Sequence, residues 1–113
     1  MAKGFWVARL DVFDVDTYKR YVEANAEAFG KYKAKFLTRG GPFHGLEGLN
    51  RSRNVILEFD DVETALACYH SPEYQRAYEI RRKIANADIY IQQGYDGPQP
   101  PDQPGDLASV RKA

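Results

Sequence analysis

The sequence predicts an α+β protein of the ferredoxin-like class, with a four-stranded antiparallel sheet and helices on one face. Segments with strand and helix periodicity follow one another in the order β-α-β-β-α-β. Asn54 to Phe59 is an apolar run interrupted once, by Glu58, as expected for a central strand. A chain of 113 residues with 43% hydrophobic residues suffices for one domain with its own core.

The first strand is expected over Gly4 to Val12. One of its two alternating sets is wholly apolar and should face the core: Trp6, Ala8, Leu10 and Val12. Asp14 can cap a helix that extends to about Lys33. Spacings of three and four predict the inward face of this helix, formed by Val15, Tyr18, Val22, Ala26 and Phe29.

A second, shorter strand is expected over Lys35 to Arg39. Gly40-Gly41-Pro42 should end it, because glycine permits positive φ and proline has no N–H for a sheet. A loop over residues 43–52 then leads to the strand of Asn54 to Phe59. Right-handed connections place the first and third strands in the middle of the sheet.

The second helix is expected in two pieces. It starts at Asp60 and breaks near His70, where Ser71 can cap a new N-terminus and Pro72 suits the first helical position. The second piece should run to about Ala87, and a last strand should follow over residues 88–94. Residues 1–95 are therefore the predicted domain, and residues 96–113 are a tail rich in proline and glycine.

Composition excludes several classes of partner. Lys+Arg 16 and Asp+Glu 16 give a net charge of zero, which argues against nucleic acid and anionic membranes as partners. No apolar run approaches the roughly 20 residues that span a bilayer. Cys68 is a lone cysteine and the N-terminus lacks a signal-peptide pattern, so we expect a cytoplasmic protein.

One face of the predicted sheet is left uncovered, and it mixes apolar with charged side chains. Its apolar members should include Phe5, Val7, Leu37 and Ile56. Pairing two such sheets would hide both faces and enclose a polar cavity. We therefore expect a homodimer that forms through this face.

Strand alternation places Arg39 and Glu58 on this uncovered face, within reach of each other on neighbouring strands. Arg39 and Glu58 are thus predicted substrate-binding residues, with Arg39 holding an anionic group. Gly40 and Gly41 should turn the next loop back over the same face. His44 and Glu47 on that loop are the predicted catalytic acid/base residues.

Each of these residues has a structural alternative. Glu58 could pair with Arg9 or Arg39, since a buried carboxylate needs a partner, and His44 could be a surface histidine. Tyr69 and Tyr74 flank the helix break and are predicted near the wall of the substrate pocket, although aromatic residues at helical spacing are usually core.

No metal or cofactor is expected. Cys68 and His70 point about 200° apart on a helix, and together with His44 they match no usual ligand spacing. The chain contains no Gly-x-Gly-x-x-Gly motif or phosphate loop.

In several of these residues the chain resembles the DUF1330 family, a group of small uncharacterised proteins of the dimeric α/β-barrel superfamily. The similarity covers about residues 3–95 and is carried by Tyr18, Tyr21, Arg39-Gly40-Gly41, Leu46-Glu47-Gly48, Arg53, Glu58-Phe59, Ala65, Tyr69, Ser71-Pro72-Glu73-Tyr74 and Arg81. Family members often have tryptophan at Cys68, asparagine at His70 and glutamate at Gln93. The resemblance implies a homodimeric barrel and no established reaction.

Two functional hypotheses follow. The first is cofactor-free proton-transfer chemistry on a small organic acid or carbonyl compound, with metal-free oxygenase chemistry as a weaker variant. The second is a dimer that binds a small ligand, or is purely structural, without turnover.

Overall fold

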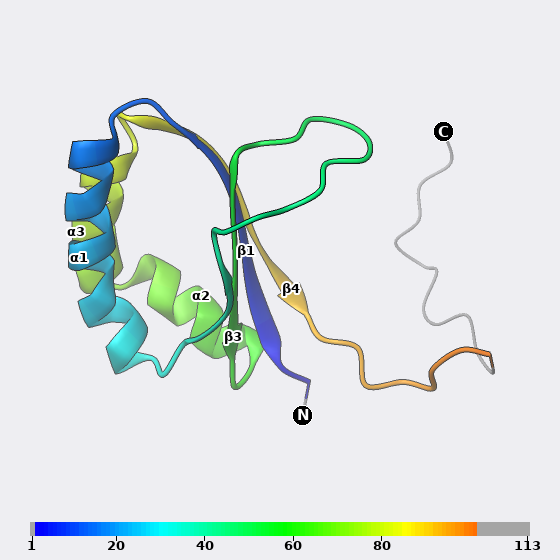
Figure 1. The fold of residues 1–113 in the computed structure, drawn as a ribbon. Helices are drawn as coiled ribbons and strands as arrows, with labels where there is room; N and C mark the ends of the chain where they lie inside the picture. The colour runs from blue at the N-terminus through cyan, green and yellow to red at the C-terminus, as the bar shows by residue number, and fades with distance from the viewer. Residues whose placement is uncertain (1, 102–113) are drawn as a thin grey trace, which may run out of the picture.

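The computed structural model describes residues 2–101, so the larger part of the predicted tail, residues 102–113, lies outside the described residues. The element order is β1 (Gly4–Val12), α1 (Val15–Lys31), β2 (Lys35–Arg39), β3 (Arg53–Phe59), α2 (Val62–His70), α3 (Pro72–Arg81) and β4 (Ala85–Gln93). Figure 1 shows the three helices on one side of the sheet. The predicted ferredoxin-like class is confirmed.

All four strands pair antiparallel in the order β2-β3-β1-β4, which confirms that β1 and β3 are central. The predicted inward set of β1 is also confirmed in its main members, because Trp6, Ala8 and Leu10 are buried under the helices. Trp6 is the centre of the core. The rings of Phe29, Phe59, Tyr69 and Tyr74 lie 4.8–6.1 Å from its ring, mostly edge-on or tilted.

The predicted caps at Asp14 and Ser71 are present, whereas the second helix starts later than the predicted Asp60, with Asp61 as its cap. Asp14 accepts from the Thr17 backbone N–H, and Ser71 both ends α2 and begins α3. The Ser71 hydroxyl donates to the Cys68 carbonyl at 2.7 Å and accepts from the Tyr74 N–H at 3.1 Å. One hydroxyl thus serves both pieces of the broken helix.

Two local predictions were wrong. The buried residues of α1 are Tyr18, Tyr21, Asn25, Ala28 and Phe29, whereas Ala26 and Val15 are exposed. The helix is rotated relative to the purely apolar spacing because tyrosines and an asparagine occupy its inner face.

The last strand begins at Ala85, not near residue 88, and α3 ends at Arg81. Ala85, Asn86 and Ala87 have weak strand propensity, but they pair with Val12, Asp11 and Leu10 of β1. Pairing with a central strand outweighs their local preference.

The crossing of β1 over the start of α2 depends on Gly4. A Cβ atom at this position would lie 2.5 Å from the Asp61 carbonyl oxygen and 2.8 Å from the Val62 Cα. The backbones therefore touch where only a hydrogen fits, which fixes the first turn of α2 against the sheet.

Candidate functional site: an arginine-lined pocket between α1 and the sheet

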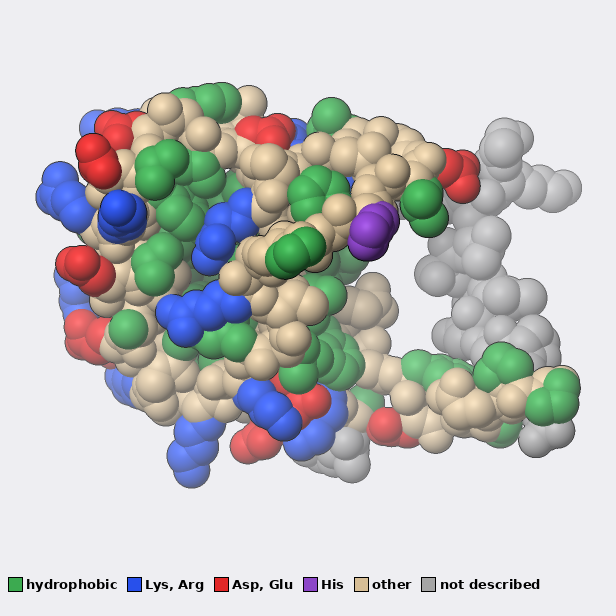
Figure 2. All heavy atoms as spheres, viewed as in Figure 1, with side chains coloured by type: hydrophobic (Ala, Val, Ile, Leu, Met, Phe, Trp, Pro, Cys, Tyr) green, Lys and Arg blue, Asp and Glu red, His purple; other side chains and the backbone are tan. Residues whose placement is uncertain are grey.

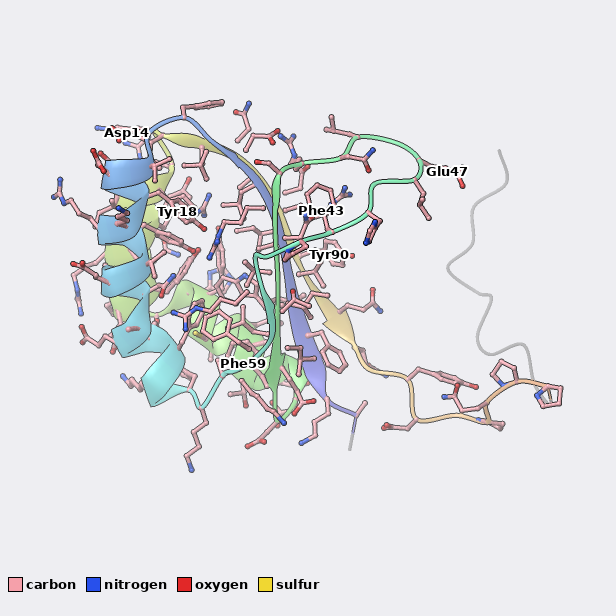
Figure 3. The ribbon with its side chains drawn as sticks, in the orientation of Figure 1. Asp14, Tyr18, Phe43, Glu47, Phe59 and Tyr90 are labelled. Atoms are coloured by element: carbon pink, nitrogen blue, oxygen red, sulfur yellow. The ribbon has the colours of Figure 1, made fainter. Side chains whose placement is uncertain are left out.

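A narrow pocket lies between α1 and the β1–β2–β3 part of the sheet. It offers about 20 Å³ of space, roughly the room of one water molecule. Its walls are mostly apolar and aromatic, and its polar side chains are Tyr18, Tyr21, Asn25, Arg39 and Arg53. In Figure 3 the Tyr18 side chain extends from α1 toward the sheet.

Arg39 reaches this pocket because β2 carries a bulge. Lys35 and Phe36 pair with Glu58 and Leu57, but Thr38 and Arg39 then pair with Ile56 and Val55, so one extra residue lies between them. Alternation is broken at that point. Arg39 consequently shares the helix-covered face with Val55, and its guanidinium lies 4.1 Å from the centre of the Phe36 ring.

Arg53 opens β3 and has the same parity as the buried residues Val55, Leu57 and Phe59. Its Nε donates to the Tyr18 hydroxyl at 3.0 Å, and its Cζ lies 5.3 Å from the centre of the Tyr18 ring. Gly40, with φ of 72°, leaves room for this guanidinium, because a Cβ there would be 2.5 Å from Arg53 Nη1. Arg39 and Arg53 therefore stand on neighbouring strands on the same side of the sheet.

The two guanidinium groups are not neutralised by carboxylates. Within residues 2–101, neither Arg39 nor Arg53 takes part in an ion pair. Burial raises the pKa of Tyr18, with the nearby Arg53 charge acting in the opposite direction. Tyr18 is thus a neutral phenol at physiological pH. Its oxygen accepts from Arg53, which leaves its own hydrogen free to donate.

A pair of hydrogen-bonded tyrosines lies at the inner side of this pocket. The hydroxyls of Tyr21 and Tyr74 are 2.9 Å apart in the interior, and burial strongly raises the pKa of Tyr74. Tyr21 lines the pocket, whereas Tyr74 is fully buried. Tyr74 does not itself line the pocket but lies behind its wall, in contact with the lining residues Tyr21, Trp6 and Phe29.

The prediction that Arg39 and Glu58 share a face was wrong. Glu58 stands on the uncovered face opposite Phe5 and Lys35, and the bulge turns Arg39 to the other side. Glu58 does not pair with Arg9 or Arg39; among the described residues it forms no ion pair. Arg9 instead donates to the Leu49 carbonyl at 2.6 Å.

His44 and Glu47 lie on a long β2–β3 connection, residues 40–52, which we term the arm. Residues 41–50 of the arm are all exposed, and Figure 3 shows Glu47 at its far end. The arm does not fold back over the Arg39–Arg53 pocket, and neither His44 nor Glu47 lines that pocket. Figure 2 shows the arm standing out from the body with hydrophobic side chains on it.

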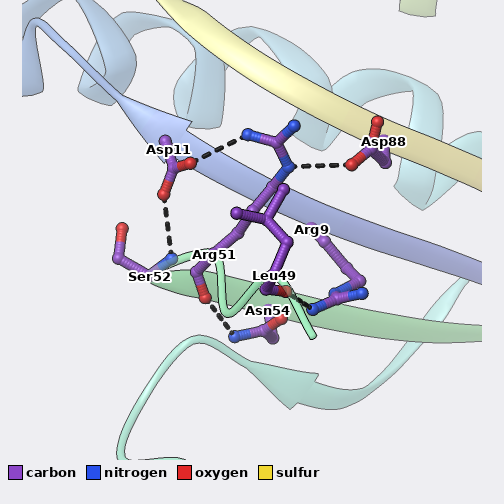
Figure 4. A network of polar contacts seen from close by, with 7 residues as sticks. All are labelled: Arg9, Asp11, Leu49, Arg51, Ser52, Asn54 and Asp88. Carbon is purple, nitrogen blue, oxygen red and sulfur yellow. Dashed lines mark hydrogen bonds and ion pairs between the residues drawn. The ribbon is translucent and has the colours of Figure 1, made fainter. Parts of the chain in front are cut away.

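The returning part of the arm is fastened to the uncovered face by Arg51. Its Nη1 and Nε lie 2.8 Å from Asp11 of β1 and 2.8 Å from Asp88 of β4 (Figure 4). The Asp11 carboxylate also accepts from the Ser52 N–H at 3.1 Å, and Asn54 donates to the Arg51 carbonyl at 3.1 Å. This network orients the arm on the side of the sheet away from the helices.

Tyr69 lines a different hollow, between α3 and β4, together with Tyr78 and Arg81. It is therefore apart from Arg39, with which it was predicted to share a pocket. Among residues 2–101, no group of three or more His, Cys, Asp or Glu side chains is placed to hold a metal ion.

Sequence reasoning missed Arg53, Tyr18 and Asn25 as pocket residues. The signal for Arg53 was present, because a charged residue in register with Val55, Leu57 and Phe59 must stand on the helix-covered face. The polar residues on the inner stripe of α1 were a second signal. Both were hidden by the expectation that the functional face is the uncovered one.

These features define the class: a small ferredoxin-like α+β protein with one sheet face covered by helices. The chain belongs to the DUF1330 family, a domain of unknown function, whose model matches residues 3–95. A search of curated proteins found no match.

Solved structures with the same fold include several of unknown function. The RPA0582 protein of Rhodopseudomonas palustris has a TM-score of 0.65 and 13% identity, over 85% of each chain. A dimeric ferredoxin-like protein from Jannaschia sp. CCS1 has a TM-score of 0.57 and 20% identity, over 80% of this chain and 97% of its own. SnoaB, a cofactor-independent oxygenase from Streptomyces nogalater, has a TM-score of 0.55 and 9% identity, over 91% of this chain and 100% of its own. At these identities the likeness establishes the fold.

None of the helices within residues 2–101 has the length and apolar character needed to cross a membrane.

Proposed function

We propose that the protein is a cytoplasmic homodimer that binds a small organic acid, with Arg39 and Arg53 holding the carboxylate at the mouth of the pocket. The observation that carries this proposal is the pair of guanidinium groups without carboxylate partners beside an aromatic pocket. Guanidinium groups match the planar carboxylate and bind it through two parallel hydrogen bonds.

Tyr18 adds a neutral donor next to the two cations. Its hydroxyl is oriented by Arg53 and retains a hydrogen for an acceptor in the pocket. A carbonyl or carboxylate oxygen would accept it. Because the pocket has room for about one water molecule, the carboxylate would lie at its mouth beside the exposed Arg39, and the rest of the ligand would stay outside.

Titration of small carboxylates such as acetate and pyruvate tests this proposal, with binding followed by arginine side-chain NMR. We expect the Arg53 Nε signal to shift saturably, and Arg53→Met or Arg39→Met to weaken binding about tenfold or more, as for loss of a charged hydrogen bond. Arg20→Met, at an exposed site on α1, is the matched control. Unchanged affinity in both pocket variants would show that the site is elsewhere.

Two glycine variants distinguish displacement of the Arg53 guanidinium from the effect of general backbone strain on binding. Gly40 and Gly41 both have positive φ, 72° and 86°, but only Gly40 is in contact with Arg53. Gly40→Ala should weaken carboxylate binding more than Gly41→Ala does, because only the first displaces the guanidinium. Equal effects would contradict the assigned role of Arg53.

A second candidate function is cofactor-free proton-transfer chemistry in a cavity between two paired sheets, with His44 and Glu47 as acid/base groups and Glu58 as a substrate contact. Two observations favour it. The arm stands on the uncovered side of the sheet, as does Glu58, and SnoaB shares the fold. Metal-free oxygenase chemistry is a variant of this candidate.

Deuterium exchange tests this candidate without knowledge of the product. Small carbonyl acids are incubated with the protein in D₂O, and loss of the proton next to the carbonyl is followed by NMR. Catalysed exchange that is lost in His44→Ala and Glu47→Gln would support it. Exchange at the uncatalysed rate with every compound would contradict this candidate, and only the binding function would remain.

A further inference from the structure

Arg81 is a buried cation at the end of α3. It is only 5% exposed, and the rings of Tyr21 and Tyr78 flank its guanidinium at 5.5 and 5.2 Å from Cζ. Its Nη2 donates to the Tyr74 hydroxyl at a long 3.4 Å, and its Nε is buried without an acceptor in residues 2–101. Within the same residues it forms no ion pair.

This environment is unusual for an arginine. Buried charges in proteins are ordinarily paired with an opposite charge, because removing an ion from water is costly. The two tyrosine faces offset part of that cost through cation–π contacts. They supply no acceptor for Nε, so the hydrogen-bonding capacity of Arg81 is not met.

Arg81 also lines a hollow between α3 and β4 that measures about 310 Å³. The aromatic walls are Tyr69 and Tyr78, Asn86 adds an amide, and Ala85, Ala87 and Ile89 supply apolar surface. Arg82 lines it too, but its Nε is paired with Glu79 at 2.8 Å. The hollow shares no lining residue with the pocket of Arg39 and Arg53.

We propose that this hollow is a second binding site, specific for a small organic carboxylate that pairs with Arg81. The single unneutralised guanidinium matches one negative charge, and its planar donor groups match a carboxylate. The apolar body of the ligand would lie on Ile89 and the alanines, beside Tyr69. The hollow is of the size that small-molecule sites in proteins have.

The test is a titration of the full-length protein with benzoate and acetate, at constant pH and ionic strength, using protein labelled with ¹⁵N-arginine. We expect the Arg81 Nε signal to shift saturably with benzoate. The variants at Arg81 lack this signal, so their binding is followed by the Nε signal of Arg82, which lines the same hollow. Arg81→Met should raise the dissociation constant at this site about tenfold or more, and Arg81→Lys less, because lysine keeps the charge but loses the planar donor pair.

Arg76→Met is the matched control, because Arg76 lies on the same helix, is exposed and is paired with Glu27 at 3.4 Å. It should leave binding unchanged. Arg53→Met should weaken carboxylate binding at the first pocket and leave the Arg81 shift intact, so failure of one site is distinguishable from failure of the other.

The absence of a saturable Arg81 shift with either carboxylate would overturn the proposal, as would an unchanged dissociation constant in folded Arg81→Met. Saturable binding of inorganic phosphate but of neither carboxylate would overturn the ligand class. If Arg81→Met is unfolded by circular dichroism, the titration of the wild-type protein decides.

Discussion

The Arg53 guanidinium both lies over the Tyr18 ring and donates to the Tyr18 hydroxyl, at 3.0 Å from Nε to oxygen. This contact joins α1 to β3, and it holds a positive charge at the mouth of the pocket.

Removing the hydroxyl should therefore destabilise the protein while leaving the ring in place. Tyr18→Phe deprives a half-buried charged donor of its acceptor, which costs about 1–3 kcal/mol. Urea unfolding measures the change. Tyr32→Phe, at a half-buried tyrosine at the end of α1, should change stability by less. Equal stability of Tyr18→Phe and wild type would contradict the structural importance of the bond.

Ser71→Ala should destabilise the junction between α2 and α3. The substitution removes a cap of α3 and a hydrogen bond to the buried Cys68 carbonyl, so we expect a loss of about 1–2 kcal/mol. Thermal or urea unfolding is the measurement. Ser52→Ala is the control, since Ser52 is exposed and contributes only its backbone N–H to the Arg51 network. A cost no larger than that of Ser52→Ala would refute the double role of Ser71.

Two glycine-to-alanine substitutions should have opposite signs. Gly4→Ala forces a methyl group against the Asp61 carbonyl and should cost on the order of 1–3 kcal/mol. Gly30→Ala meets nothing within 4 Å at the end of α1 and should stabilise by about 0.5 kcal/mol, from helix propensity. The difference in unfolding free energy between these two variants is the readout, and a shared sign would be inconsistent with the packing of Gly4.

Much of this fold follows from residue patterns. Gly4–Val12 and Lys35–Arg39 were predicted with their observed bounds, because each has clear alternation or a glycine stop. The rotation of α1 was not predicted, because Tyr21 and Asn25 are polar residues whose burial depends on what faces them. That Arg53 stands on the helix-covered face was predictable from strand alternation. The face of Arg39 was not predictable, since the bulge beside it leaves no mark in the residue types.

Cys68 should be almost unreactive in the folded protein. Burial raises the pKa of its thiol from 9.0 to about 12, with the charge of Glu73 adding to the effect. At pH 8 the thiolate fraction is then about a thousandfold below that of an ordinary cysteine. Reaction with a thiol reagent should be correspondingly slow in native protein and fast in guanidinium chloride. Similar rates in both would show that the thiol is accessible.

The same shift has a consequence for stability in alkali. The unfolded thiol ionises near pH 9.0 and the folded one near pH 12. Below pH 9 the thiol is protonated in both states, so its contribution to the free energy of unfolding is fully present there. The free energy of unfolding should therefore fall as the pH rises through this window, and Cys68→Ser should lack this component of the decline.

Dimerisation should depend on the uncovered sheet face. Val7 and Ile56 lie opposite each other on its two central strands, and solved structures of this fold are described as dimeric. Ile56→Lys should shift the protein toward a monomer of 12.9 kDa in sedimentation equilibrium. Leu66→Lys, at an exposed leucine on α2, should not. A monomeric wild-type protein at micromolar concentration would contradict this assignment.

The bulge in β2 absorbs one residue of chain length. If Leu37 paired in the regular register, Arg39 would fall opposite Asn54, on the uncovered side of the sheet; with the bulge it stands opposite Val55. Deletion of Leu37 would remove the bulge and leave the arginine opposite Val55, because Thr38 would still pair with Ile56. β2 is an edge strand, so the extra residue disturbs one ladder of hydrogen bonds and not two. At such an edge the chain can gain or lose a single codon while the binding group after it stays on the same side of the molecule.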